Sequence, residues 1–94
     1  MYKKVNDFPK YYRQKFLLGL LQRFGYSLNK TDFIKYLFLI ENEENINRNY
    51  FFLPYKYGPF SFHAYADLRR LDELSFIRFN KKIDLINKKI DYLS

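Results

Sequence analysis

The stretch that decides the fold is residues 54–61, PYKYGPFS, which runs directly into residues 62–71, FHAYADLRRL. Pro59 restricts its own backbone and disfavours helical geometry at Gly58, so no helix is expected to cross this point. The side-chain oxygen of Ser61 can accept a hydrogen bond from the first free amides of a following helix. The sequence therefore predicts a rigid aromatic turn that leads into a helix from Ser61 to about Leu74.

On a helical wheel, this predicted helix has one apolar face and one polar face. The residues expected to point inward are Ala64, Tyr65, Leu68, Leu71 and Leu74, and those expected to point outward are His63, Ala66, Arg69, Arg70 and Glu73. The two adjacent arginines would then face solvent or a partner. They could also pair with the neighbouring acidic residues Asp67, Asp72 and Glu73 within a turn of the helix.

Two further helices are expected before this turn. The first runs from about Pro9 to Phe24, because Pro9 suits a first helical turn and Gly25 suits the position after a helix end. The second begins after Asn29, a capping residue followed three positions later by a carboxylate. Its acidic end, with Glu41, Glu43 and Glu44, is interpreted as a solvated terminus, since the spacing of a calcium-binding loop is missing.

Three segments have the character of strands. Residues 50–53, YFFL, are β-prone and are expected to form a short strand that ends at Pro54. Residues 76–80 and 81–86 alternate at strand period around a basic polar turn, which predicts a hairpin of the kind called a wing. Residues 90–94 alternate again and would either extend the hairpin or begin another element.

These elements predict an α+β fold, namely a small winged-helix-like domain with three helices, a short strand and a C-terminal β-hairpin. The 94 residues, of which 48% are hydrophobic, leave room for one domain with one core, which would span residues 1–94.

Composition excludes several classes of function. Without cysteine the chain forms no disulfide and no thiolate metal site, and its one histidine cannot build a zinc site alone. No apolar run approaches the ~18 to 20 residues of a membrane span, and the N-terminus has no signal-peptide pattern, so a cytoplasmic protein without membrane contact is expected. The carboxylates are scattered over polar faces, so we expect no enzyme, no cofactor and no metal.

A formal net charge of +7 indicates an acidic partner. Cations predominate in residues 1–30 and 74–94, whereas residues 31–47 are acidic. The first hypothesis is a non-catalytic DNA-binding domain of a bacterial or phage regulator or defence-associated protein, acting on double-stranded DNA. The residues predicted to bind it are Lys3, Lys4, Lys81 and Lys82 for phosphates and Ser61, His63, Arg69 and Arg70 for bases. Arg78 is also among the predicted DNA-binding residues. A two-fold homodimer would be a usual way for so small a domain to gain affinity.

Several motifs carry a resemblance to a known family. They are residues 35–39, KYLFL, residues 57–61, YGPFS, and residues 68–71, LRRL, before Phe76 and Ile77. Together they resemble a winged-helix-type bacterial domain, and more specifically the Panacea family of SocA-type antitoxins, over roughly residues 28–79. The resemblance implies a second hypothesis, a protein interaction module that binds and neutralises or recruits a partner protein.

The surface expected to grip such a partner includes Tyr55, Lys56 and Tyr57, or the apolar flanks of the first two helices. Tyr55 and Tyr57 could also stack on bases. Because they lie beside Pro54 and Pro59, we favour the interpretation that their rings lock the loop onto the core.

Overall fold

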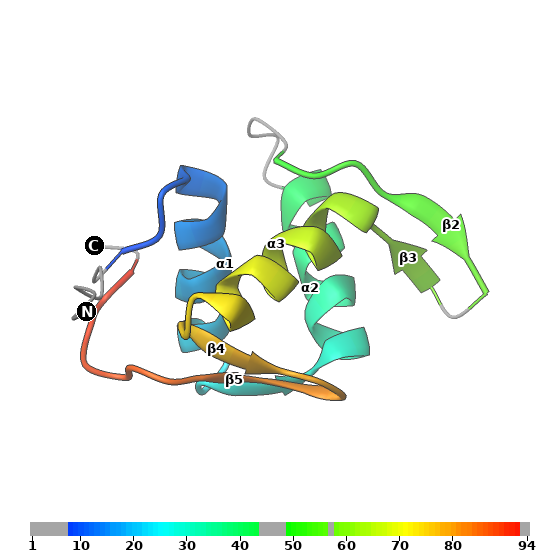
Figure 1. Cartoon of the computed structure of the whole chain (residues 1–94). Coiled ribbons are helices and arrows are strands. Elements are labelled where there is room, and N and C mark those ends of the chain that lie inside the picture. The colour runs from blue at the N-terminus through cyan, green and yellow to red at the C-terminus, as the bar shows by residue number, and fades with distance from the viewer. Residues whose placement is uncertain (1–7, 44–48, 57, 93–94) are drawn as a thin grey trace.

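The computed structural model describes residues 8–43, 49–56 and 58–92 (Figure 1). Its elements follow in the order α1 (Tyr12–Arg23), β1 (Ser27–Asn29), α2 (Lys30–Glu43), β2 (Leu53–Tyr55), β3 (Gly58–Phe60), α3 (Phe62–Glu73), β4 (Ile77–Phe79) and β5 (Lys82–Leu85). The predicted α+β class, with three helices and a C-terminal hairpin, is confirmed.

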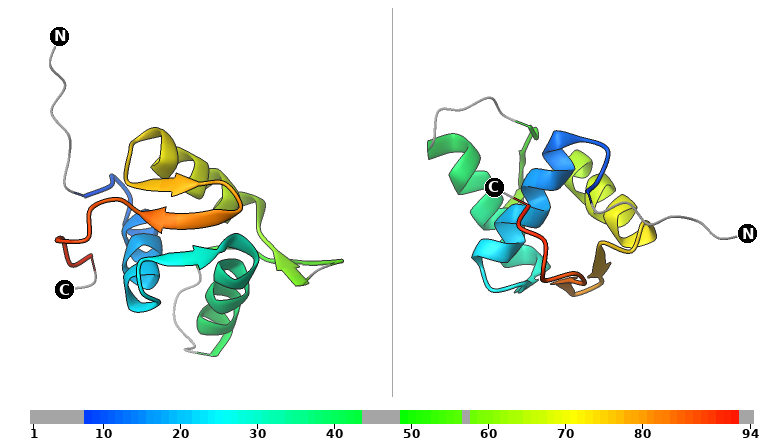
Figure 2. Two further views of the ribbon diagram at one scale, coloured as in Figure 1. Left: turned by 90° about the horizontal axis from the view of Figure 1, so that it is seen from below. Right: turned by 90° about the vertical axis from the view of Figure 1, so that its left-hand side faces the viewer.

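The strands form two separate antiparallel sheets. One has the order β1-β5-β4, and the other is the hairpin of β2 and β3. In the first sheet Leu28 of β1 lies opposite Ile83 of β5, which in turn lies opposite Phe79 of β4. Figure 2 shows this sheet on one side of the helices, with the β2–β3 hairpin extending away from the body of the molecule. The C-terminal hairpin is therefore joined by a third strand, β1.

One hydrophobic cluster joins the three helices to the larger sheet. Its most buried members include Leu17, Leu18, Leu21, Phe33, Leu37, Ala64, Leu68, Leu71, Ile77 and Ile83. The predicted inward face of α3 is confirmed, with Ala64, Leu68 and Leu71 buried and with Tyr65 and Leu74 partly buried against the cluster.

The ends of the first two helices follow local backbone chemistry, with one correction. α1 begins at Tyr12, three residues after the expected Pro9, because Tyr11 is extended (φ −107°, ψ 142°) and its side chain caps nothing. Gly25 follows the helix with φ +92°, a conformation that suits glycine, as predicted. The cap of α2 is also confirmed, since Asn29 Oδ1 accepts hydrogen bonds from the amides of Thr31 and Asp32.

The expectation of a solvated acidic end for α2 is wrong for Glu41. Its side chain is buried, and its two carboxylate oxygens accept hydrogen bonds from the backbone amides of Asn49 and Tyr50, each at 3.1 Å. These bonds satisfy a charged group that would otherwise be costly to bury. Glu41 thus holds the segment that returns from α2 toward β2. The side chain of Glu43 and all of Glu44 lie outside the described residues.

The strand expected at residues 50–53 is also wrong. Residues 50–52 are unpaired, and the strand begins at Leu53 and continues through Pro54. Pro54 lies directly opposite Pro59 in the β2–β3 hairpin. In an antiparallel hairpin, every second pair of opposed residues points its backbone N–H and C=O groups away from the partner strand. Because neither proline has an N–H, Pro54 and Pro59 must form such a pair, and they fit without loss of a hydrogen bond between the strands.

The alternating pattern at residues 90–94 does not extend the hairpin over its described part. Residues 90–92 form no strand; instead, the buried Tyr92 donates its amide to Gln22 Oε1 at 2.9 Å. Gln22 Nε2 in turn donates to the carbonyl of Ile90. One side chain of α1 therefore holds the chain after β5.

Candidate nucleic-acid interface

The candidate interface is built around α3, whose start depends on Ser61. The Ser61 hydroxyl accepts a hydrogen bond from the Ala64 amide at 3.1 Å, as the sequence predicted. Ser61 is fully buried, however. Its oxygen is therefore committed to the helix cap, and we remove Ser61 from the residues that could contact bases.

A buried network anchors α3 to α1, and the sequence did not reveal it. Asp67 Oδ2 accepts hydrogen bonds from Arg13 Nε at 2.7 Å and from the Tyr50 hydroxyl at 2.8 Å, while Oδ1 accepts from Gln14 Nε2 at 3.1 Å. The Asp67 side chain is only 6% exposed. From the sequence, Asp67 is expected only to pair with the neighbouring arginines of α3. Arg13 lies 54 positions before Asp67 in the chain, and no local sequence pattern connects the two residues.

The network changes the proton affinity of its members. Burial of Asp67 raises the pKa of its carboxyl, but the hydrogen bonds from Arg13, Gln14 and Tyr50 outweigh burial and leave that pKa below its ordinary value. The hydrogen bond to Asp67 also raises the pKa of Arg13. Burial, together with the adjacent Asp67 charge, raises the pKa of Tyr50. The network is therefore a carboxylate paired with a guanidinium and a protonated phenol, which together fix the orientation of α3.

A groove of about 400 Å³ lies between α3 and the turn that joins β4 to β5. It is lined by Lys30, Tyr65, Arg69, Asp72, Phe79, Asn80 and Lys81. Three of these residues are cations and one is a carboxylate. They come from the start of α2, from α3 and from the wing, so the groove exists only in the folded chain.

The wing turn is held in place by backbone hydrogen bonds. The Lys30 amide donates to the Lys81 carbonyl at 3.1 Å, and the Asn80 amide donates to the Lys82 carbonyl at 3.0 Å. Asn80 Oδ1 also accepts from the Lys82 amide at 3.2 Å. The start of α2 and the wing turn are thus joined directly, which fixes Lys30 and Lys81 on the same groove.

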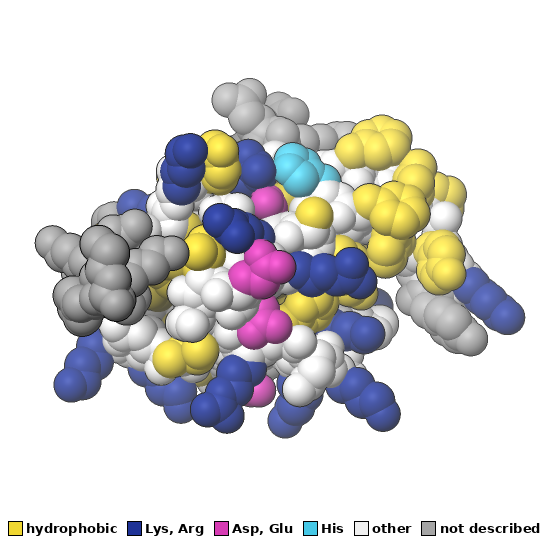
Figure 3. Space-filling model, in the orientation of Figure 1, with side chains coloured by type: hydrophobic (Ala, Val, Ile, Leu, Met, Phe, Trp, Pro, Cys, Tyr) yellow, Lys and Arg dark blue, Asp and Glu magenta, His cyan; other side chains and the backbone are white. Residues whose placement is uncertain are grey.

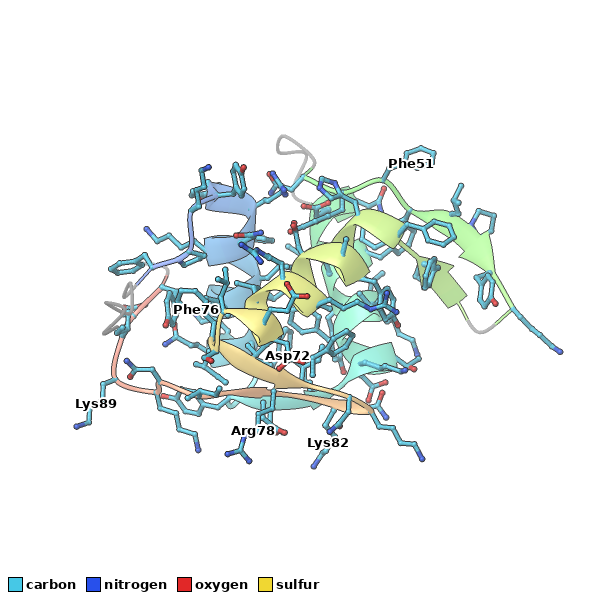
Figure 4. The ribbon with its side chains drawn as sticks, viewed as in Figure 1. Phe51, Asp72, Phe76, Arg78, Lys82 and Lys89 are labelled. Carbon is cyan, nitrogen blue, oxygen red and sulfur yellow. The ribbon has the colours of Figure 1, made fainter. Side chains whose placement is uncertain are left out.

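The predicted DNA-binding residues do not all share one surface. Arg69 and Lys81 line the groove together, whereas Arg70 Nη1 pairs with Glu73 Oε1 at 3.1 Å within α3. Figure 4 shows Arg78 and Lys82 extending from the larger sheet on the side away from α3. Lys3 and Lys4 lie outside the described residues. The structure adds Lys30, which the sequence did not single out because it appears there only as one more lysine near a helix start.

His63 is half exposed near the start of α3, and its ring packs edge-on against Tyr50 with centroids 5.4 Å apart. Its Nε2 lies 4.0 Å from Asp67 Oδ2. This position is on the exposed side of α3, as predicted, but it lies beside the anchoring network, and His63 does not line the groove.

The predicted locking of the aromatic turn onto the core is wrong for Tyr55. Its side chain lies on β2 and is 65% exposed, because the hairpin extends from the body of the molecule. Lys56 is also exposed, and Tyr57 lies outside the described residues.

Within the described part of the chain, no helix has both the length and the apolar character that a membrane-spanning segment requires. In the same residues, no three His, Asp or Glu side chains gather where they could hold a metal ion.

Comparison with known proteins adds no assignment: no protein-family model, curated protein or solved structure matches this chain.

Proposed function

We propose that this chain is a non-catalytic, winged-helix-like domain that binds double-stranded DNA. In this proposal Arg69 and Arg70 of α3 read base edges, while the groove lysines Lys30 and Lys81 contact phosphates. The observation that carries the proposal is the meeting of Lys30, Arg69 and Lys81 in one groove between α3 and the wing. Cations that converge from three elements match a phosphate backbone better than cations scattered over a surface.

The anchoring of α3 supports the same function. A helix that reads bases must keep a fixed orientation, and the Asp67 network ties α3 to α1 and to Tyr50. The exposed side of α3 is free of large apolar residues between Ala66 and Glu73, which leaves Arg69 and Arg70 on a polar surface. Arginine can hydrogen-bond a guanine edge or a phosphate with two nitrogens at once.

Selection of bound sequences from a random duplex pool tests the proposal. The Arg69→Ala, Arg70→Ala double variant should keep the fold and lose sequence preference, with about 1–3 kcal/mol lost for each base contact made with two hydrogen bonds. Arg23→Ala, at the exposed end of α1, controls for the loss of one positive charge away from the groove. The parent protein must prefer some DNA sequences and bind with an affinity that depends on salt. If the parent and the double variant both bind all sequences equally, base reading by α3 is contradicted.

A second candidate, docking of a protein partner, is favoured by one observation on α2. The Phe24 and Tyr36 rings stack with centroids 4.6 Å apart at an exposed position, and Leu39 is exposed one turn further along α2. These residues belong to the apolar flanks of the first two helices. Pull-down from the native host with and without nuclease separates the two functions, because a protein contact survives nuclease and a DNA-mediated one does not.

A further inference from the structure

A row of aromatic rings connects the β2–β3 hairpin with the groove. Tyr55 packs on Phe60 with centroids 5.5 Å apart, Phe60 stacks on Tyr65 at 4.7 Å, and Tyr65 packs on Phe79 at 5.8 Å. Tyr65 and Phe79 also line the groove that contains Arg69 and Lys81. This aromatic row, defined as Tyr55, Phe60, Tyr65 and Phe79, therefore continues the proposed DNA-binding surface toward the hairpin.

The outer end of the row is not covered by the rest of the protein. Tyr55 is 65% exposed, and Phe62, which packs edge-on against Phe60 at 4.7 Å, is 71% exposed. Figure 3 shows hydrophobic side chains gathered over the β2–β3 hairpin and the start of α3, while Lys and Arg side chains lie over much of the remaining face. Two flat rings thus stand beside a basic surface without contributing to the buried core.

The backbone of the hairpin restricts how a partner could bind there. Pro54 and Pro59 occupy the opposed positions whose backbone groups point outward, and neither proline can donate a hydrogen bond. A third strand would therefore find no N–H donor at the centre of either edge. A partner on this hairpin must be held mainly by side chains, among which Leu53, Tyr55 and Lys56 are exposed and Tyr55 supplies a flat ring.

We propose that Tyr55 and Phe62 stack on unpaired bases of a nucleic-acid strand that continues from a duplex held at the groove. This inference rests on the proposed DNA-binding function. Proteins that bind single strands combine stacking rings with cations that follow the backbone, and here the row leads from Tyr55 to Arg69, Lys81 and Lys30. Because every base has an aromatic face, this contact would tolerate any sequence. The preferred ligand is then a junction between duplex and single-stranded DNA.

Binding of two matched DNAs to the full chain tests the inference. One is a blunt duplex, and the other is the same duplex with a single-stranded extension of about ten nucleotides, prepared with either strand polarity. Fluorescence anisotropy should show tighter binding of at least one extended DNA, by ~5-fold to ~150-fold for each stacked base. A 2-aminopurine placed in the extension should lose fluorescence on binding, as expected when its base stacks on a ring.

The Tyr55→Ala, Phe62→Ala double variant should bind the blunt duplex as the parent does and lose the advantage of the extended DNA. Tyr12→Ala controls for the loss of one exposed ring, because Tyr12 is as exposed as Phe62 but lies at the start of α1, far from the hairpin in Figure 1. Circular dichroism should show the same fold for all three proteins, since these rings lie at the surface.

The outcomes separate this inference from the proposed function. The stacking role is overturned if the parent binds blunt and extended DNA equally, or if the double variant keeps the preference for extended DNA. Tyr55 and Phe62 would then be candidates for contact with a protein partner instead. If blunt DNA still binds with a strong salt dependence, the proposed function survives that result. If neither DNA binds, both proposals fail.

Discussion

At the scale of single residues, Asp67 illustrates how a polar side chain can be essential inside a small core. It accepts hydrogen bonds from Arg13, Gln14 and Tyr50, which lie on α1 and on the segment before β2. In the described residues, no buried side-chain nitrogen or oxygen is left without a hydrogen-bond partner. Removing one member of such a network leaves the others buried and unpaired, and the cost then exceeds the value of any single bond.

We expect Asp67→Asn to lower the free energy of unfolding by about 2–3 kcal/mol. This is below the ~3–5 kcal/mol typical of fully buried pairs, because the Arg13 side chain remains 29% exposed. Urea denaturation at neutral pH measures the change. Asp72→Asn, which alters an exposed carboxylate of the same helix, should change stability by less than about 0.5 kcal/mol. Equal effects of the two substitutions would contradict the anchoring role of Asp67.

The lowered pKa of Asp67 also predicts a pH dependence. The folded protein holds this carboxylate in its charged form more strongly than the unfolded chain does, so the unfolded state binds more protons as the solution becomes acidic. The stabilising contribution is complete above the ordinary carboxyl pKa of about 4 and is lost as pH falls through the lower folded-state pKa. Urea titrations between about pH 5 and 2 should therefore show a steeper loss of stability for the parent than for Asp67→Asn.

At the scale of elements, the β2–β3 hairpin depends on the backbone conformation of Gly58. Gly58 has φ +120°, and a Cβ atom built there would meet no heavy atom within 4 Å. From the sequence, the turn is expected to need a small residue between Tyr57 and Pro59. The structure shows that the requirement comes from the backbone angle of Gly58 and not from crowding by neighbouring atoms, because residues other than glycine rarely adopt such a φ.

We expect Gly58→Val to destabilise the protein by about 1–3 kcal/mol, the usual cost of a residue held in an unfavourable backbone region. Thermal denaturation should show a lower melting temperature than for Arg70→Ala, which removes only an exposed pair with Glu73. Similar melting temperatures would indicate that the hairpin can relax without affecting the start of α3.

The wing provides a prediction in which two adjacent lysines differ. Lys81 lines the groove, whereas Lys82 extends from the other side of the sheet. Lys81→Ala should weaken binding of all DNA sequences to a similar extent and reduce the slope of log affinity against log salt by about 1. Lys82→Ala should have a smaller effect on both quantities. Fluorescence anisotropy at several salt concentrations measures them, and a larger effect at Lys82 would place the DNA on the outer face of the sheet.

At the scale of the whole molecule, charge and shape act together. The chain carries a net charge of +7, and among the described cations are groups at the groove, on the outer face of the sheet, after β5 and on α1. A duplex in the groove would contact the groove cations directly. The other cations would attract it electrostatically over a distance of about 10 Å in ordinary salt.

We expect affinity for duplex DNA to fall ~10³-fold or more between ~50 and ~200 mM salt if about six phosphates are neutralised. The physical reason is the release of counterions from the duplex, which becomes less favourable as salt rises. Titration of a labelled duplex at four or five salt concentrations measures the slope. An affinity that is flat across this range would contradict the DNA-binding proposal for the chain as a whole.

Much of the architecture follows from local chemistry in the sequence. The caps at Asn29 and Ser61, the glycine after α1, the apolar face of α3 and the hairpin predicted at residues 76–86 all depend on neighbours in the chain. All are confirmed, the hairpin with strands at residues 77–79 and 82–85. The Pro54 to Pro59 segment was recognised as a rigid turn, although it proved to be a hairpin with its own two strands. Such features are visible in the sequence because propensity and periodicity act over a few residues.

Only the tertiary structure decided which distant residues meet. β1 has three residues and no pattern of its own, and it becomes a strand because β5 offers it a backbone partner. The burial of Glu41, the Arg13–Asp67 pair and the joining of Lys30, Arg69 and Lys81 in one groove depend on chain segments that only folding brings together. The sequence alone therefore determined the three helices, the C-terminal hairpin and the basic charge. Packing decided which charges are buried as anchors and which remain exposed to meet a ligand, because burial depends on neighbours that are remote in the chain.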